Sequence, residues 1–220
     1  MVNETITENT IPLLDSADTI DRALQLMEDN DLQCLPLVEE DKYLALIKED
    51  DLLELSHTDL PLAETSLLLF RPAVAASAHP YDAVRMLHNT GLQLIPVVDN
   101  ENTYLGCISQ KGLYKYLTEH SGINTPGAII VLELQPNNYS LYEIARICEN
   151  EDIIITQVQL SNAKESGRLE LTLKTNRNDI RGVVDALERY NYTVVQTFGE
   201  ADFNENIQNR FDLLMNYLNM

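Results

Sequence analysis

Basic residues are scarce in this sequence, whereas acidic residues are abundant. The 220 residues include 15 Lys and Arg against 35 Asp and Glu, which gives a formal net charge of −20. Proteins bind nucleic acids and anionic membrane surfaces through clusters of Lys and Arg. The charge balance argues against both kinds of partner, so we expect the protein to bind neither a nucleic acid nor a membrane.

Long apolar runs and paired cysteines are also missing. No stretch approaches the roughly 18 consecutive apolar residues of a membrane span, and the first ten residues lack the basic region and apolar core of a secretory signal. Cys34, Cys107 and Cys148 are widely spaced among apolar neighbours, as is typical of cysteines that act as small buried hydrophobic residues. We therefore expect a cytoplasmic protein with three buried thiols.

Motifs of the common enzyme classes are absent. The sequence contains no G-x-S-x-G nucleophile motif, no phosphate-binding glycine loop and no H-E-x-x-H zinc motif. The four histidines are isolated from one another and from the cysteines. We therefore predict a protein that is not an enzyme.

Its apolar runs, such as Leu67–Phe70 and Ala128–Leu132, predict buried strands.

An internal repeat organises the first half of the chain. The segment Leu32–Val38 (LQCLPLV) matches Leu92–Val98 (LQLIPVV), with Pro36 at the position of Pro96. Apolar residues at helical spacing precede each copy, and a polar turn with a second apolar strand follows it. Each copy is predicted to contain helix, strand, hairpin, strand and helix within about 55–60 residues.

The two copies resemble a pair of cystathionine-β-synthase (CBS) domains, which are sensors of adenosyl ligands. The likeness covers about residues 8–120 and is carried by the hydrophobic-Pro-hydrophobic-Val strand of each copy with the turn and strand that follow. It implies an α+β fold in which two β-α-β-β-α units pack together. The implied ligand is AMP, ATP or S-adenosylmethionine, bound in a cleft between the repeats.

The resemblance also indicates which residues would hold this ligand. Adenosyl-binding repeats end in Ile-Ser/Thr-x-x-Asp-Leu, whose hydroxyl meets phosphate and whose carboxylate binds the ribose. The first repeat has Lys48 at the hydroxyl position and keeps Asp51; the second keeps Ser109 and has Gly112 at the carboxylate position. A ribose diol needs a carboxylate acceptor, which makes the first repeat the better candidate. His79, in the loop before a helix at the cleft, is a further candidate.

Other interpretations of the first half stay open. Asp51 also suits the first turn of a helix, where the helix dipole favours an acid. Half a motif in each repeat is consistent with an interaction module that has lost its ligand and acts through dimerisation. Residues 1–64 hold 17 acidic and 3 basic residues, so a divalent-cation sensor is a third interpretation. The same acidity would repel ATP more than AMP or S-adenosylmethionine.

Beyond residue 127 the pattern alternates between strands and helices. The predicted strands are Ala128–Leu134, Ile153–Leu160, Leu169–Lys174 and Tyr192–Phe198. Helices are predicted after Ser140, a suitable N-cap, and from Ile180. The order is βαββαβ, which predicts a ferredoxin-like sheet with two helices on one face.

This order resembles an ACT domain, a small regulatory module that often binds amino acids. The likeness is carried by Gly127–Leu134, Ser140–Ile147 and Val184–Tyr192. The implied ligand loop contains Asn137, Asn138 and Tyr139 where the family usually has Pro-Gly; a structural turn is the alternative. A CBS pair followed by an ACT-like domain is the layout of acetoin-utilisation AcuB-type proteins, which implies an accessory or regulatory role.

The predicted organisation has five parts. They are a first CBS repeat (1–64), a second CBS repeat (65–120), a linker (121–127), an ACT-like domain (128–199) and a C-terminal helix (200–220). The last helix is predicted from an apolar stripe formed by Ile207, Phe211, Leu214 and Leu218. The resemblance implies a homodimer that couples nucleotide binding in the CBS cleft to the ACT-like domain and to an unidentified regulated protein.

Overall fold

The computed structural model describes residues 8, 10–55, 59–162 and 167–199. These residues form two compact units, of which the first extends to Leu117 and the second starts at Thr118. Both units combine helices with strands, which confirms the predicted α+β fold class. No helix in the described ranges is long and apolar enough to cross a membrane. The predicted C-terminal helix lies outside the described residues.

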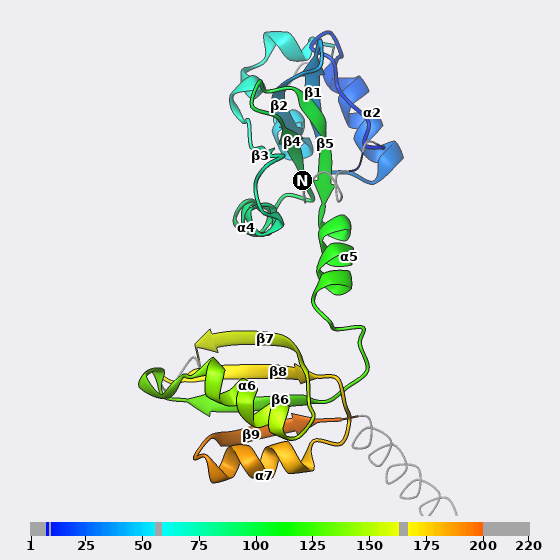
Figure 1. Cartoon of the computed structure of the whole chain (residues 1–220). Helices are drawn as coiled ribbons and strands as arrows, with labels where there is room; N and C mark the ends of the chain where they lie inside the picture. Colours follow the sequence, from blue (N-terminus) through cyan, green and yellow to red (C-terminus); the bar gives the residue numbers. More distant parts are fainter. Residues whose placement is uncertain (1–7, 9, 56–58, 163–166, 200–220) are drawn as a thin grey trace, which may run out of the picture. The chain divides into compact units, whose positions relative to one another are not determined.

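The first unit contains two copies of one motif (Figure 1). The first copy consists of α2 (Ile20–Asn30), β1 (Cys34–Glu39), β2 (Lys42–Lys48) and α3 (Glu49–Leu53). The second consists of β3 (Val74–Ala75), α4 (Pro80–Thr90), β4 (Leu94–Val98), β5 (Tyr104–Ser109) and α5 (Gln110–His120). β3 pairs with β4 in parallel, and a parallel bridge from Leu14 to Leu37 takes its place in the first copy. The predicted internal repeat is therefore a structural repeat.

The two copies are interlocked through their backbones. Glu8, ahead of the first copy, exchanges hydrogen bonds of 2.7 and 3.0 Å with Cys107 on β5 of the second. Conversely, the amide of Leu46 on β2 donates to the carbonyl of Phe70, ahead of the second copy, at 2.9 Å. Each copy therefore satisfies backbone hydrogen-bonding groups of the other.

Strands β1, β2, β4 and β5 of the first unit are buried on both faces over most of their length, and helices α2 and α4 are amphipathic. Helix α2 buries Ile20, Ala23 and Met27, and α4 buries Ala83 and Leu87 at matching positions. All three cysteines of the chain are free and buried, as predicted. Burial raises the pKa of Cys107 to about 12 and that of Cys148 to about 11, so these thiols are poor nucleophiles at neutral pH.

The prediction of a buried strand over Leu67–Phe70 is wrong. Short 3-10 helices, η1 (Leu62–Glu64) and η2 (Ser66–Leu69), precede Phe70, and Leu69 is 84% exposed. The side chain of Thr65 accepts from the amide of Leu67 and so starts the second of these turns. Capping by a local side chain decides the conformation here.

The second unit is a four-stranded antiparallel sheet with two helices (Figure 1). Its elements are β6 (Ile129–Leu134), η3 (Pro136–Asn138), α6 (Leu141–Asn150), β7 (Ile155–Asn162), β8 (Leu169–Thr175), α7 (Arg181–Arg189) and β9 (Thr193–Phe198). The strand order β7-β8-β6-β9 matches the predicted βαββαβ arrangement. Both helices bury their apolar sides in one core with the alternate residues of β6 and β8.

Candidate functional site

Lys48 and Asp51 occupy the two motif positions of the first repeat and are in contact. We call this pair the first half-site, and the equivalent positions Ser109 and Gly112 the second half-site. Lys48 ends β2, and Asp51 lies in the first turn of α3. The ammonium nitrogen of Lys48 is 3.2 Å from Oδ1 of Asp51, and each side chain is about one third exposed (37% and 34%). The pair presents hydrogen-bond donors and a carboxylate side by side at an accessible position.

An aromatic ring adjoins this pair. The ammonium of Lys48 is 5.2 Å from the centroid of the Phe70 ring, within the range of a cation–π contact. Phe70 belongs to the segment that pairs with β2 and is 36% exposed. Sequence spacing does not identify Phe70 as a site residue, because only the backbone contact between the two repeats brings it next to Lys48.

Ser109 is engaged differently from Lys48. Its hydroxyl donates to Oε1 of Glu8 at 2.6 Å and accepts from the amide of Gly112 at 2.9 Å. Ser109 therefore caps the start of α5. The Glu8 carboxylate occupies the position from which a ligand anion would accept a hydrogen bond from the Ser109 hydroxyl. An incoming phosphate would meet a carboxylate there, so the second half-site is less suited to an anionic ligand.

His79 is an N-cap. Its Nδ1 accepts from the amide of Tyr81 at 3.1 Å, and its ring packs edge-on against the Tyr81 ring with centroids 4.6 Å apart. Thr19 occupies the same position before α2 and accepts from the amide of Arg22. Within the described part of the chain, no hydrogen bond or ion pair joins His79 or Ser109 to the Lys48–Asp51 pair.

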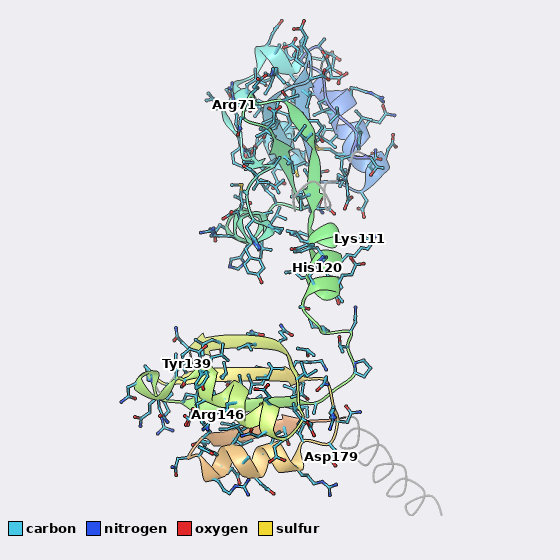
Figure 2. The ribbon with its side chains drawn as sticks, in the orientation of Figure 1. Arg71, Lys111, His120, Tyr139, Arg146 and Asp179 are labelled. Carbon is cyan, nitrogen blue, oxygen red and sulfur yellow. The ribbon has the colours of Figure 1, made fainter. Side chains whose placement is uncertain are left out.

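Arg71, Arg85 and Lys111 lie on elements other than those that carry Lys48 and Asp51. Figure 2 shows Arg71 in the segment before β3 and Lys111 in the first turn of α5. The side chain of Arg71 donates to the carbonyl of Leu68 at 2.8 Å, and Arg85 pairs with Asp82. Lys48 is therefore the cation that directly accompanies the candidate carboxylate.

Acidic side chains of the first repeat do not converge on one point. Across residues 8, 10–55, 59–162 and 167–199, no group of three His, Cys, Asp or Glu side chains is placed to hold a metal ion. The interpretation as a divalent-cation sensor therefore gains no support from the described residues.

The second unit has a cavity of about 500 Å³ at the predicted ACT loop. It is lined by Glu133, Leu134, Gln135, Asn137, Asn138, Arg168, Asn191 and Thr193. Asn137 and Asn138 were predicted to bind a ligand, whereas Tyr139 is not among the lining residues (its place before α6 is labelled in Figure 2). Arg168, directly before β8, forms an ion pair with Glu133 on β6. The cavity lining therefore carries one positive and one negative charge.

The chain was compared with models of protein families. The model of the CBS domain matches twice, at residues 4–58 and 71–119. These ranges contain the two structural repeats described above. The first half of the chain is a tandem CBS domain pair.

Several solved structures are similar to about half of the chain. A CBS domain pair/ACT domain protein from Thermotoga maritima is 19% identical, with a TM-score of 0.46 over 53% of this chain and 95% of that one. The protein CBSX2, solved in complex with AMP, is 18% identical, with a TM-score of 0.46 over 53% of this chain and 95% of that one. The CBS pair of a putative Mg²⁺ transporter from Shewanella oneidensis is 23% identical, with a TM-score of 0.46 over 52% of this chain and 68% of that one.

Proposed function

We propose that the CBS pair is a regulatory, non-catalytic module that binds an adenosyl ligand at the Lys48–Asp51 half-site. The observation that carries this proposal is the 3.2 Å contact between an ammonium group and a carboxylate at the two motif positions. In the bound state Asp51 accepts from the two ribose hydroxyls, and Lys48 donates to the phosphate. The Phe70 ring beside Lys48 offers a flat apolar surface to the ligand.

Charge favours a ligand with few phosphates. Residues 1–64 carry 3 basic against 17 acidic residues, a net charge of −14. Each additional phosphate adds repulsion from these carboxylates, whereas Lys48 supplies one positive charge. We therefore propose AMP, or the cationic S-adenosylmethionine, in preference to ATP.

The test measures nucleotide binding to the full chain by calorimetry, with AMP, ATP and S-adenosylmethionine in parallel. Asp51→Asn keeps the size of the side chain and removes the charged acceptor, so we expect it to weaken AMP binding at least about tenfold. The matched control is Asp50→Asn, which removes an exposed carboxylate from the same helix turn. Thermal unfolding provides a second readout, since a ligand at 100 times its Kd stabilises by about 2.7 kcal/mol.

Two results would contradict the proposal. If AMP binds equally to Asp51→Asn and to the unmodified chain, the half-site is wrongly assigned. If none of the three ligands binds to a well-folded chain, the favoured function becomes an interaction module without a ligand, as the Glu8–Ser109 contact in the second half-site already suggests.

A second ligand site is proposed at the cavity of the second unit. Its lining places the Arg168 guanidinium near the Glu133 carboxylate, together with the amides of Asn137 and Asn138. This set suits a small zwitterion of the amino-acid class, whose carboxylate and ammonium need partners of opposite charge. Adding amino acids to the panel above tests it, and loss of their binding in Asn137→Ala/Asn138→Ala, but not in the exposed Asn150→Ala, would support it.

The cellular setting is proposed on the resemblance alone. We propose a cytoplasmic homodimer that couples ligand binding to a regulated partner protein. Light scattering of the purified chain measures the oligomeric state directly.

A further inference from the structure

The two half-sites share one construction. The amide of Cys107 on β5 donates to the carbonyl of Glu8 at 3.0 Å, and the amide of Leu46 on β2 donates to the carbonyl of Phe70 at 2.9 Å. Cys107 and Leu46 are equivalent, because each lies two positions before the first residue of its half-site. Glu8 and Phe70 are therefore equivalent as well. Each belongs to the segment ahead of one repeat and pairs with a strand of the other repeat.

The side chains of this equivalent pair both reach the first residue of a half-site. The Phe70 ring has its centroid 5.2 Å from the ammonium of Lys48. The Glu8 carboxylate accepts from the hydroxyl of Ser109 at 2.6 Å. The same place is thus taken by an uncharged ring in the first half-site and by a carboxylate in the second.

The start of helix α5 favours this carboxylate. The amide ends of helices attract negative charge, and residues 110–113 of the first turn include no acid. Helix α3, in contrast, carries Glu49, Asp50 and Asp51 in its own first turn. Glu8 therefore supplies, from outside the second repeat, the anion that the start of α5 favours.

The backbone of Glu8 fixes its carboxylate at this position. Glu8 exchanges two hydrogen bonds with Cys107, of 2.7 and 3.0 Å, and the Cys107 side chain is buried. A ligand phosphate that approached Ser109 would have to break a short, charge-assisted hydrogen bond. It would also meet the negative charge of Glu8 at close range.

We propose that Glu8 is a specificity residue that excludes phosphate-bearing ligands from the second half-site. Its carboxylate takes the hydrogen bond that a phosphate would otherwise accept from Ser109. Phe70, at the equivalent position, adds no such repulsion beside Lys48, so the CBS pair holds one nucleotide per chain, at the first half-site. This inference rests on the proposed function, because it takes the first residue of a half-site as the group that meets phosphate.

The test counts the AMP molecules bound per full chain by calorimetric titration at 0.15 M NaCl. The second half-site also lacks a ribose carboxylate, which Gly112→Asp supplies at the position equivalent to Asp51 and in a helix turn that suits an acid. We expect Gly112→Asp to bind one AMP, like the unmodified chain, and Glu8→Ala/Gly112→Asp to bind two. Adding Ser109→Ala to the double variant should weaken the second binding event at least about tenfold.

The matched control is Glu28→Ala/Gly112→Asp, which removes an exposed carboxylate of α2 in place of Glu8. We expect this control to bind one AMP. A second AMP here would overturn the proposal, because the overall charge of the chain would then set the number of ligands. Circular dichroism verifies that every variant is folded.

The results separate this inference from the proposed function. If Gly112→Asp alone binds two AMP, or if Glu8→Ala/Gly112→Asp binds only one, Glu8 does not exclude the ligand, while the AMP bound by the unmodified chain still upholds the first half-site. If the unmodified chain binds none and Glu8→Ala/Gly112→Asp binds one that requires Ser109, the inference holds and the assignment of the first half-site fails. Absence of AMP binding in every variant overturns both.

Discussion

Tyr192 and Glu143 form the best-defined polar contact of the second unit. The Tyr192 hydroxyl donates to Oε2 of Glu143 at 2.6 Å, while the Tyr192 side chain is only 3% exposed. Burial, followed by this hydrogen bond and the charge of Glu143, raises the pKa of Tyr192 from 10.0 to about 12. Ser140 caps the start of α6 as predicted, and the side chain of Glu143, three residues further, accepts from the Tyr192 hydroxyl.

The raised pKa of Tyr192 predicts a pH dependence of stability. The folded state favours the neutral phenol, so its contribution is complete below pH 10 and is lost as pH rises through 12. Tyr192→Phe should therefore lower the free energy of unfolding by about 1–2 kcal/mol at pH 8, and the difference should shrink between pH 10 and 12. Urea unfolding followed by circular dichroism measures it.

Tyr190→Phe is the control for this experiment, since Tyr190 is 45% exposed. Its hydroxyl forms no hydrogen bond among the described contacts, and phenylalanine keeps the ring under Arg146. A Tyr192→Phe difference that stays constant up to pH 12 would show that the phenol does not titrate as inferred.

At the scale of the elements, the stability of helix α6 depends on its N-cap, Ser140. Ser140 accepts from the amide of Glu143 at 3.3 Å and so satisfies one of the unpaired amides at the start of α6. Ser140→Ala should reduce the free energy of unfolding by about 1 kcal/mol, and Ser140→Asp should restore it, because aspartate is an equally good cap. Urea unfolding of the two variants provides the measurement; an equal loss in both would show that the hydroxyl does more than cap the helix.

Under the proposed function, a ligand at the Lys48–Asp51 half-site would contact elements of both repeats. The half-site combines Lys48 at the end of β2, Asp51 in α3 and Phe70 in the segment ahead of the second repeat. A ligand held by all three would connect the end of the first repeat to the segment that begins the second. Binding can bias such an arrangement only by its different affinity for two conformations, and this position touches both repeats.

At the scale of the molecule the dominant feature is its charge. With 35 acidic and 15 basic residues, and with the excess concentrated in residues 1–64, the folded chain repels itself. Raising NaCl from 0.02 to 0.5 M shortens the screening length severalfold. We expect the melting temperature to rise, by about 2–4 °C for each kcal/mol of repulsion relieved. Scanning calorimetry over this salt range measures the rise.

The variant Asp21→Asn/Asp29→Asn/Asp50→Asn tests whether charge repulsion causes this salt dependence. It removes three exposed charges from the acidic repeat, so its melting temperature should depend less on salt than that of the unmodified chain. A melting temperature that falls with salt would mean that attractive ion pairs outweigh the repulsion.

The repeat and the order of elements could be predicted because they are recorded in local apolar patterns. Leu32–Val38 and Leu92–Val98 became β-strand segments of equivalent copies, and the alternation after residue 127 became the βαββαβ sheet. Periodicity depends on each residue and its near neighbours, so the sequence alone is enough to detect it. The burial of the three cysteines followed from the same local signal.

The environment of the candidate site was decided only in the tertiary structure. Ser109 meets a carboxylate 101 positions away in the sequence, and Phe70 reaches Lys48 where its carbonyl accepts from the amide of Leu46 on β2. Local apolarity also misjudged Leu67–Phe70, where a threonine cap outweighs it. Motif spacing in the sequence predicts which residue types occupy a half-site. Which of them meet a ligand depends on contacts between distant segments, and chain folding alone brings those segments together.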